Sequence, residues 1–203
     1  MGHFTGPRCK IARRFKEPIF GNEGKTLEKR PNPPGQHGAN KRRKVSEYGQ
    51  QLAMKQKAKA IYGMREKQFR LFFERAKASE GFTKGDAFLA LCECRLDNVC
   101  YRLGFSPTRP GARQLVTHRH VTVNGKVCNV PSCIVRPGDV VSIREKDRDM
   151  IAVVDSLKNP RSAQMSWLSW DDATMQGTLV SVPMRAEIPE NIDVQPIVEF
   201  FSR

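Results

Sequence analysis

The sequence has few features of membrane, secreted or metal-binding proteins. No apolar run approaches the roughly 18–20 residues of a transmembrane helix, and the first eight residues hold no apolar stretch of the signal-peptide kind. The six cysteines include no Cys-x-x-Cys pair, so the commonest zinc and redox motifs are missing. We therefore expect a cytoplasmic protein that contacts no membrane and binds no metal or other cofactor.

Acidic residues are scarce compared with basic ones. The 203 residues include 35 Lys and Arg but only 21 Asp and Glu, which gives a formal net charge of +14. The charge is unevenly spread, because residues 1–150 carry a net +17 and residues 151–203 carry −3. Such an asymmetry predicts a polyanionic partner, and a nucleic acid is the foremost candidate.

The first 46 residues are typical of an extended basic arm. Prolines and glycines recur at short intervals and prevent long helices, while basic residues continue up to the block Lys41-Arg42-Arg43-Lys44. Arginine binds phosphate through two hydrogen bonds, and glycine lets the backbone approach phosphate closely. We expect residues 1–46 to be an irregular arm that orders against RNA. The alternative is a disordered basic tail.

Helical patterns follow the arm and predict a helical domain over residues 47–93. Ser46 is a suitable N-cap for a helix that ends near Gly63. Phe69, Phe72 and Phe73 are spaced for one apolar face of a second helix over about 64–79. Thr83, followed three residues later by Asp86, resembles a capping box for a third helix. The apolar end of the chain, within 175–203, is expected to pack back on this domain.

The next block predicts short helices followed by a small antiparallel sheet. Thr108 is placed to cap a helix on which Arg109 and Arg113, four residues apart, share one face. Asn124-Gly125 is typical of a type I′ hairpin turn, and Pro137-Gly138 predicts a second turn that leads into a strand. We assign this module to residues 94–155 and a connecting segment to 156–174. The fold class expected is α+β.

Several short motifs in this block and around it resemble one family. The series Arg95-Leu96-Asp97-Asn98, Val123-Asn124-Gly125-Lys126 and Pro137-Gly138-Asp139 is similar to the S-four RNA-binding module. Flanking motifs such as Pro33-Pro34-Gly35-Gln36-His37-Gly38 and Ala112-Arg113-Gln114-Leu115-Val116 extend the similarity to almost the whole chain. The chain therefore resembles the bacterial-type small-subunit ribosomal protein S-four family.

Three positions depart from the family pattern. Many members hold zinc with four cysteines in the arm, whereas here only Cys9 matches and Ala12 stands where a second cysteine is expected. Pro110-Gly111 replaces a more helix-forming pair, and Arg119 stands between two histidines where the family often has glycine. The first departure supports the expectation that no zinc is bound.

The resemblance implies a structural role in the small (30S) ribosomal subunit. It implies direct binding to 16S ribosomal RNA at a helix junction of the 5′ domain, nucleation of subunit assembly, and an influence on translational accuracy near the channel through which mRNA enters. The implied partners are this RNA, the ribosomal proteins S-five and S-twelve, and mRNA. It also implies that the RNA-binding module is inserted into an otherwise helical domain.

Basic residues of the arm, the first helices and the module are the RNA-binding candidates. We predict that the contacts come from Arg8, Lys10, Arg13, Arg14, Lys41, Arg42, Arg43, Lys44, Lys55, Lys57, Lys59, Arg109, Arg113, His118, Arg119, His120 and Lys126. Binding would rest on release of counterions from phosphates and on the shape of the RNA junction.

Other interpretations of the same residues remain. Arg95-Leu96-Asp97 resembles the catalytic motif of pseudouridine synthases, but the Thr-x-Gly that should follow is absent, so we expect no enzyme. An RNA binder acting on stalled ribosomes would lack the N-terminal 90 residues. Cys128 and Cys133 could join His118 and His120 as zinc ligands, but free thiols in a reducing compartment are favoured.

Overall fold

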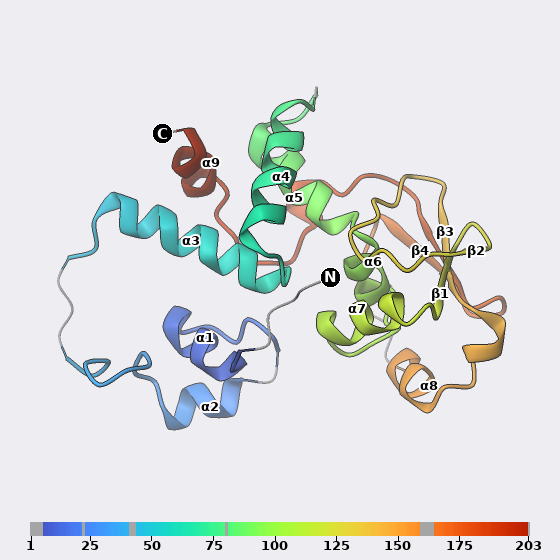
Figure 1. Ribbon diagram of the computed structural model, residues 1–203, viewed down its shortest axis with the longest axis horizontal. Helices are drawn as coiled ribbons and strands as arrows, with labels where there is room; N and C mark the ends of the chain where they lie inside the picture. The colour runs from blue at the N-terminus through green and yellow to red at the C-terminus, as the bar shows by residue number, and fades with distance from the viewer. Residues whose placement is uncertain (1–5, 22, 41–43, 80, 159–164, 203) are drawn as a thin grey trace. The chain divides into compact units, whose positions relative to one another are not determined.

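The chain forms helices and one antiparallel sheet, which confirms the α+β class. The computed structural model describes residues 6–21, 23–40, 44–79, 81–158 and 165–202 (Figure 1). They divide into two compact units, one of Met1–Glu74 with Asn191–Arg203 and one of Arg75–Glu190. No helix among these residues is long and apolar enough to span a membrane. The domain boundaries expected from the sequence stay a prediction.

The arm at the start of the first unit contains two short helices. Helix α1 (Arg8–Phe15) follows Pro7 and ends at Lys16, whose φ of 59° lies in the left-handed region. Helix α2 (Gly24–Lys29) is shorter still. The prolines and glycines limit both lengths, as the sequence indicates, but Ala12 is wholly buried and Arg13 Nε donates to the carbonyl of Asn32 at 2.9 Å. Local packing therefore gives part of the arm regular structure where irregular chain is expected.

The rest of the first unit is built from helices that pack through aromatic residues. Helix α3 (Glu47–Ile61) begins as predicted, with Ser46 Oγ accepting from the amide of Gly49 at 3.2 Å. Helix α4 (Glu66–Lys77) buries Phe69 and Phe73, and helix α9 (Gln195–Ser202) packs against α3 (Figure 1). The ring of Phe201 on α9 lies 4.4 Å from that of Phe73. The C-terminal helix and two helices from the first half of the chain thus share one small core.

Three helices open the second unit. Helices α5 (Lys84–Glu93) and α7 (Arg109–Thr117) are capped by Thr83 and Thr108, whose hydroxyls accept from backbone amides at 3.2 Å. Between them lies helix α6 (Leu96–Arg102). Its first amide, that of Leu96, donates to the carbonyl of Cys133 at 2.8 Å, so a distant loop satisfies a helix end.

A five-stranded antiparallel sheet completes this unit. The strand order is β2 (Lys126–Val127), β1 (Val121–Val123), β3 (Val140–Ile143), β5 (Gln176–Leu179) and β4 (Leu168–Asp171). Between β1 and β2, Asn124 and Gly125 have φ of 50° and 76°, as a type I′ turn requires. Gly177 of β5 lies so close to Leu103 that a Cβ atom added at position 177 would clash with the Leu103 side chain.

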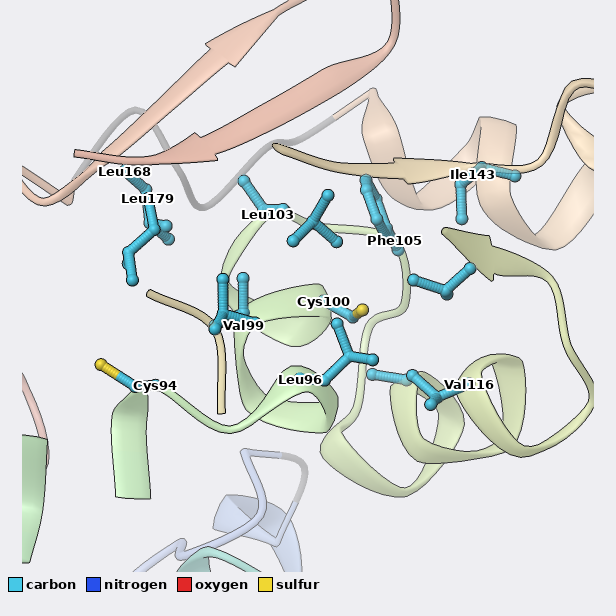
Figure 2. Packing of buried hydrophobic residues seen from close by; sticks show 14 of the residues in the cluster. Cys94, Leu96, Val99, Cys100, Leu103, Phe105, Val116, Ile143, Leu168 and Leu179 are labelled. Carbon is cyan, nitrogen blue, oxygen red and sulfur yellow. The ribbon is translucent and has the colours of Figure 1, made fainter. Parts of the chain in front are cut away.

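The sheet and helices α6 and α7 enclose the core of the second unit. Leu96 and Cys100 of α6 and Val116 of α7 point toward one another, with Ile143 of β3 nearby (Figure 2). Helix α8 (Ile151–Leu157) adds Val153, and Trp167 is buried beside β4. Strands β4 and β5 therefore share a hydrophobic core with the module expected at 94–155.

Candidate nucleic-acid interface

Two groups of ion pairs hold four arginines of the second unit. The first group is a network centred on Glu93, whose side chain is 0% exposed. Both carboxylate oxygens of Glu93 accept from Arg102, at 2.9 and 2.8 Å, and Oε2 also accepts from Asn98 at 2.6 Å. A buried carboxylate is tolerable only with such partners, so these contacts fix α5 against α6.

The network continues to the first turn of α7. Glu190 accepts from Arg102 through one oxygen and from Arg109 through the other. Arg109 Nε also donates to Asn98 Oδ1 at 2.8 Å, and its guanidinium lies 4.5 Å from the centre of the Tyr101 ring. Arg109 is thus held by a carboxylate 81 residues away along the chain, a contact that no local sequence pattern signals.

A second carboxylate holds the next arginine of α7. Asp97 accepts from Arg95 through two hydrogen bonds of 3.0 and 2.6 Å and from Arg113 at 2.8 Å. Arg109 and Arg113 share one face of α7 as the spacing indicates, but that face meets acidic groups of the same chain, and each side chain is only 13% exposed. Their expected role in RNA binding stays a prediction.

The three candidate lysines of α3 also have intramolecular partners. Lys55 pairs with Glu66 and lies 4.4 Å from the ring centre of Phe200, while Lys59 contacts Glu66 at 3.0 Å. Burial opposes ionisation of Glu66, but hydrogen bonds from both lysines outweigh it and lower its pKa. Lys57 reaches Glu17 of the arm at 2.7 Å. Lys55 and Lys57 are buried, so they brace the first unit, and RNA contact by α3 stays a prediction.

Candidate residues of the arm lie at the surface. Arg8, Lys10 and Arg14 on α1 are exposed, and so is Lys44. Among the described residues, none of these four forms a salt bridge with a carboxylate, whereas Arg13 donates to backbone carbonyls. Lys41, Arg42 and Arg43 lie outside the residues that the structure describes.

The turn after α7 presents a second group of candidates. Arg119 has a φ of 67°, and its amide donates to Val116 while that of His120 donates to Leu115, the two bonds of a Schellman helix end. This position favours glycine, which explains the family preference, and here it carries an exposed guanidinium. His118 is exposed, whereas Nδ1 of His120 lies 3.0 Å from Asp147.

The hairpin tip carries the last candidate and is tied to its neighbouring turn. Lys126 is exposed directly after the Asn124-Gly125 turn. Asn124 donates to Asp139 at 2.8 Å and accepts from the amide of Val140 at 2.9 Å. The Asn-Gly and Pro-Gly-Asp motifs are thus joined directly by hydrogen bonds. These bonds hold the hairpin tip, and with it the backbone of Lys126, in place.

Comparison with known proteins assigns this architecture to a family. Residues 3–93 match the model of the ribosomal protein S4/S9 N-terminal domain, and residues 94–141 match the S4 domain. The chain is 54% identical to a protein of Parabacteroides distasonis over 203 residues and 50% identical to one of Porphyromonas gingivalis. Both alignments cover the full length of this chain and of the relative. A Flavobacterium psychrophilum protein is 55% identical over 204 positions, again at full length. All three are called small ribosomal subunit protein uS4.

The chain belongs to the uS4 family. This confirms the resemblance drawn from the motifs, and with it a ribosomal protein of the small subunit that carries an S4 RNA-binding domain. The uS4 relatives are ribosomal proteins and not enzymes, so the Arg95-Leu96-Asp97 motif has no catalytic meaning here. In the structure it forms the buried Arg95–Asp97 pair instead. The chain is therefore a protein of the bacterial ribosome, which lies in the cytoplasm.

No zinc cluster accompanies the uS4 architecture in the part of the chain that is described. Within it, no three His, Cys, Asp or Glu side chains gather in a way that could hold a metal ion. Cys92, Cys94 and Cys100 are buried free thiols, and Cys9 is exposed. The absence of zinc stays a prediction that needs metal analysis.

Proposed function

We propose that the protein binds 16S ribosomal RNA directly at a helix junction of the 5′ domain and nucleates assembly of the small subunit. Family membership supports this proposal, and the distribution of charge supports the mode of binding. The observation that carries it is the contrast between two kinds of basic residue: those buried in ion pairs and those exposed on the arm, the α7–β1 turn and the hairpin tip.

The exposed group is the proposed RNA-binding surface. Those that were candidates from the sequence and are exposed within the described residues are Arg8, Lys10, Arg14, Lys44, His118, Arg119 and Lys126. Exposed cations release counterions from phosphate on binding, whereas an arginine paired with a carboxylate must first give up that partner. We therefore assign Arg109 and Arg113 a positioning role, in which they hold the start of α7 so that its end presents His118 and Arg119.

The proposal extends to the position of the protein in the ribosome and to its effect on translation. By its family, the chain would lie near the channel through which mRNA enters, beside the ribosomal proteins S-five and S-twelve, and would influence translational accuracy. A protein that holds several RNA helices at once suits an early step of assembly, because both compact units carry exposed basic residues. Specificity would come from junction geometry, since the deep groove of A-form RNA hides its base edges.

The test compares two double variants of the full-length chain. Arg119→Ala with Lys126→Ala removes two exposed charges of the proposed surface, and Lys84→Ala with Lys158→Ala removes the same charge from exposed positions outside it. Affinity for the isolated 5′-domain RNA is measured by filter binding at one fixed salt concentration. The first variant should bind more weakly by about tenfold or more, on the scale of two lost phosphate contacts. Equal affinities of the two variants would reject the proposed surface.

The function itself has a separate readout. Small subunits are isolated from native lysate and washed at rising salt concentration. One copy of the protein should remain for each washed subunit, as a structural component requires. If fewer than one copy per subunit remains and salt removes it, the protein would instead be a factor that binds the ribosome transiently.

A further inference from the structure

The motif Pro33-Pro34-Gly35-Gln36-His37-Gly38 forms a small closed loop between α2 and α3 (Figure 1). Its two ends touch, because a Cβ atom added at Gly38 would lie 1.9 Å from the carbonyl oxygen of Pro33. Every other residue type carries that atom, so the loop closes in this form only with glycine at position 38. The amide of Gly38 also donates to the carbonyl of Gly35 at 3.1 Å, and Gly35 itself has a φ of 110°. The shape of the loop is therefore constrained at several points.

An arginine of α1 anchors the start of this loop. Arg13 Nε donates to the carbonyl of Asn32 at 2.9 Å, and Nη2 donates to that of Pro33 at 3.4 Å. Pro33 is buried, and the neighbour of Arg13 on α1, Ala12, is 0% exposed, so packing holds both sides of this contact. Arg13 thus uses two of its donors to fix the loop against α1.

The tip of the loop presents two polar side chains to solvent. Gln36 and His37 are exposed, and neither side chain forms a hydrogen bond or ion pair with another of the described residues. Exposed cations border the loop along the chain, Lys29 and Arg30 before it and Lys44 after it. A polyanion attracted by these cations would therefore meet a constrained tip whose hydrogen-bonding groups are available.

We propose that loop 33–38 is a specificity element for RNA, in which Gln36 and His37 contact unpaired bases and Arg13 and Gly38 position them. This inference rests on the proposed function, because it takes the ligand to be the 16S RNA junction named there. A glutamine amide both donates to and accepts from the edge of an unpaired base, and an imidazole ring stacks on one. Contacts to bases distinguish one RNA from another, whereas contacts to phosphates mainly position the protein.

The constrained shape of the loop favours such a role. A loop that already has its bound conformation loses little chain entropy when it binds, so more of the contact energy contributes to affinity. The exposed cations of α1 act differently, because their attraction to phosphate is similar for any RNA and weakens as salt is added. The two kinds of contact are therefore separable: the tip should control the preference among RNAs, and the cations should control the dependence on salt.

The experiment measures the affinity of the full-length protein for the isolated 5′-domain RNA and for an unrelated RNA of the same length, by filter binding at several salt concentrations. Gln36→Ala with His37→Ala should weaken binding to the 5′-domain RNA by about tenfold or more, on the scale of a lost base contact. Its affinity for the unrelated RNA and its salt slope should equal those of the wild type. The control, Ser181→Ala with Asn191→Ala, shortens two exposed polar side chains elsewhere and should bind both RNAs like the wild type.

Positioning of the tip is tested by opening the loop. The methyl group of Gly38→Ala must separate the two ends of the loop, so this variant should lose about as much preference as the tip variant. The triple variant that combines Gly38→Ala with both tip substitutions should lose little more, because all three act through the same contacts. Gly24→Ala is the matched control: a Cβ atom there meets open space, so the variant should bind like the wild type. Circular dichroism checks that the helices of each variant persist.

Two outcomes would overturn the role of the loop and leave the proposed function intact. In one, the wild type prefers the 5′-domain RNA and the tip variant keeps that preference in full. In the other, the tip variant loses affinity equally for both RNAs, which would make the tip a non-specific contact. Additive losses in the triple variant would reject the positioning by Gly38. If the wild type itself shows no preference between the RNAs, the proposed function fails and the role of the loop fails with it.

Discussion

Buried charges in the second unit are matched group by group. Four arginines meet three carboxylates there, Glu93, Asp97 and Glu190, through hydrogen bonds that satisfy both oxygens of each acid. Such a network adds little when compared with a well-packed apolar core, but the loss of one partner leaves a charge without compensation in a region of low polarity. Each acid is therefore more important for stability than its small size suggests.

Substitution of the central acid should show this cost. Glu93→Gln keeps the shape of the side chain but leaves Arg102 with a single carboxylate, that of Glu190. We expect the free energy of unfolding to fall by about 3 kcal/mol, the lower end of the range for breaking a buried pair, because Glu190 remains. Urea unfolding followed by circular dichroism measures the change. Asp149→Asn, at an exposed position, is the control. A loss no greater than that of the control would contradict the role of the network.

Single residues also show where prediction from the sequence stops. The caps Ser46, Thr83 and Thr108 are found as predicted, because each bonds an amide three residues ahead. The partners of Arg109 are not predictable in this way, since Glu190 is brought to it only by the fold. Arginines four apart on a helix are equally compatible with an RNA surface and with an internal network. Charge in the sequence indicates a partner of opposite sign but does not say in which molecule it lies.

At the scale of elements, the hairpin depends on the neighbouring turn. The carboxylate of Asp139 accepts from the amide of Arg136 at 2.7 Å and from Asn124 at 2.8 Å, and these two bonds lower its pKa. Each motif was predicted from its own turn geometry, but the bond between them depends on the pairing of β1 with β3. The local pattern therefore predicts the turns, and the register of the sheet brings them together.

The lowered pKa of Asp139 makes the bond between the two turns dependent on pH. The ionised Asp139 stabilises the fold fully above its ordinary pKa of 3.8, and the contribution is lost as the pH falls through the lower folded-state value. Asp139→Asn removes one of the two acceptors at every pH. We expect the wild type to unfold at higher urea concentration than the variant at neutral pH, and the difference to shrink below pH 3.8. A difference that stays constant down to the acid transition would show that the charge is irrelevant.

At the scale of the whole molecule, the cysteines have properties that disfavour a structural zinc. Zinc binds thiolates, but the thiols of Cys92, Cys94 and Cys100 are buried with raised pKa values, and the arm offers only Cys9. We expect the purified protein to contain no stoichiometric zinc and a chelator to leave its thermal unfolding midpoint unchanged. One zinc ion per chain in elemental analysis would overturn this interpretation.

The net charge of +14 is a poor measure of the charge available to RNA. Part of it lies on arginines and lysines that are paired inside the two units, such as Arg113 with Asp97 and Lys57 with Glu17. Exposed basic residues lie on α1, α2 and α4 and around the end of α7 and the hairpin. The sequence itself shows that residues 1–46 are basic, but which of these charges are exposed depends on the packing of α1 around Ala12.

The exposed charges of the arm should therefore determine the dependence of RNA binding on salt. Arg8→Ala, Lys10→Ala and Arg14→Ala together remove three exposed cations of α1. Each phosphate contact contributes about 0.7–0.9 to the slope of log affinity against log salt concentration, so the slope should fall in magnitude by about 2–3. The control removes Lys84, Lys146 and Lys158, exposed lysines of the second unit outside the proposed surface. Because both variants lose the same net charge, a long-range effect of charge alone would lower both slopes equally. Only direct phosphate contacts predict that the slope changes for the arm variant and stays near the wild-type value for the control.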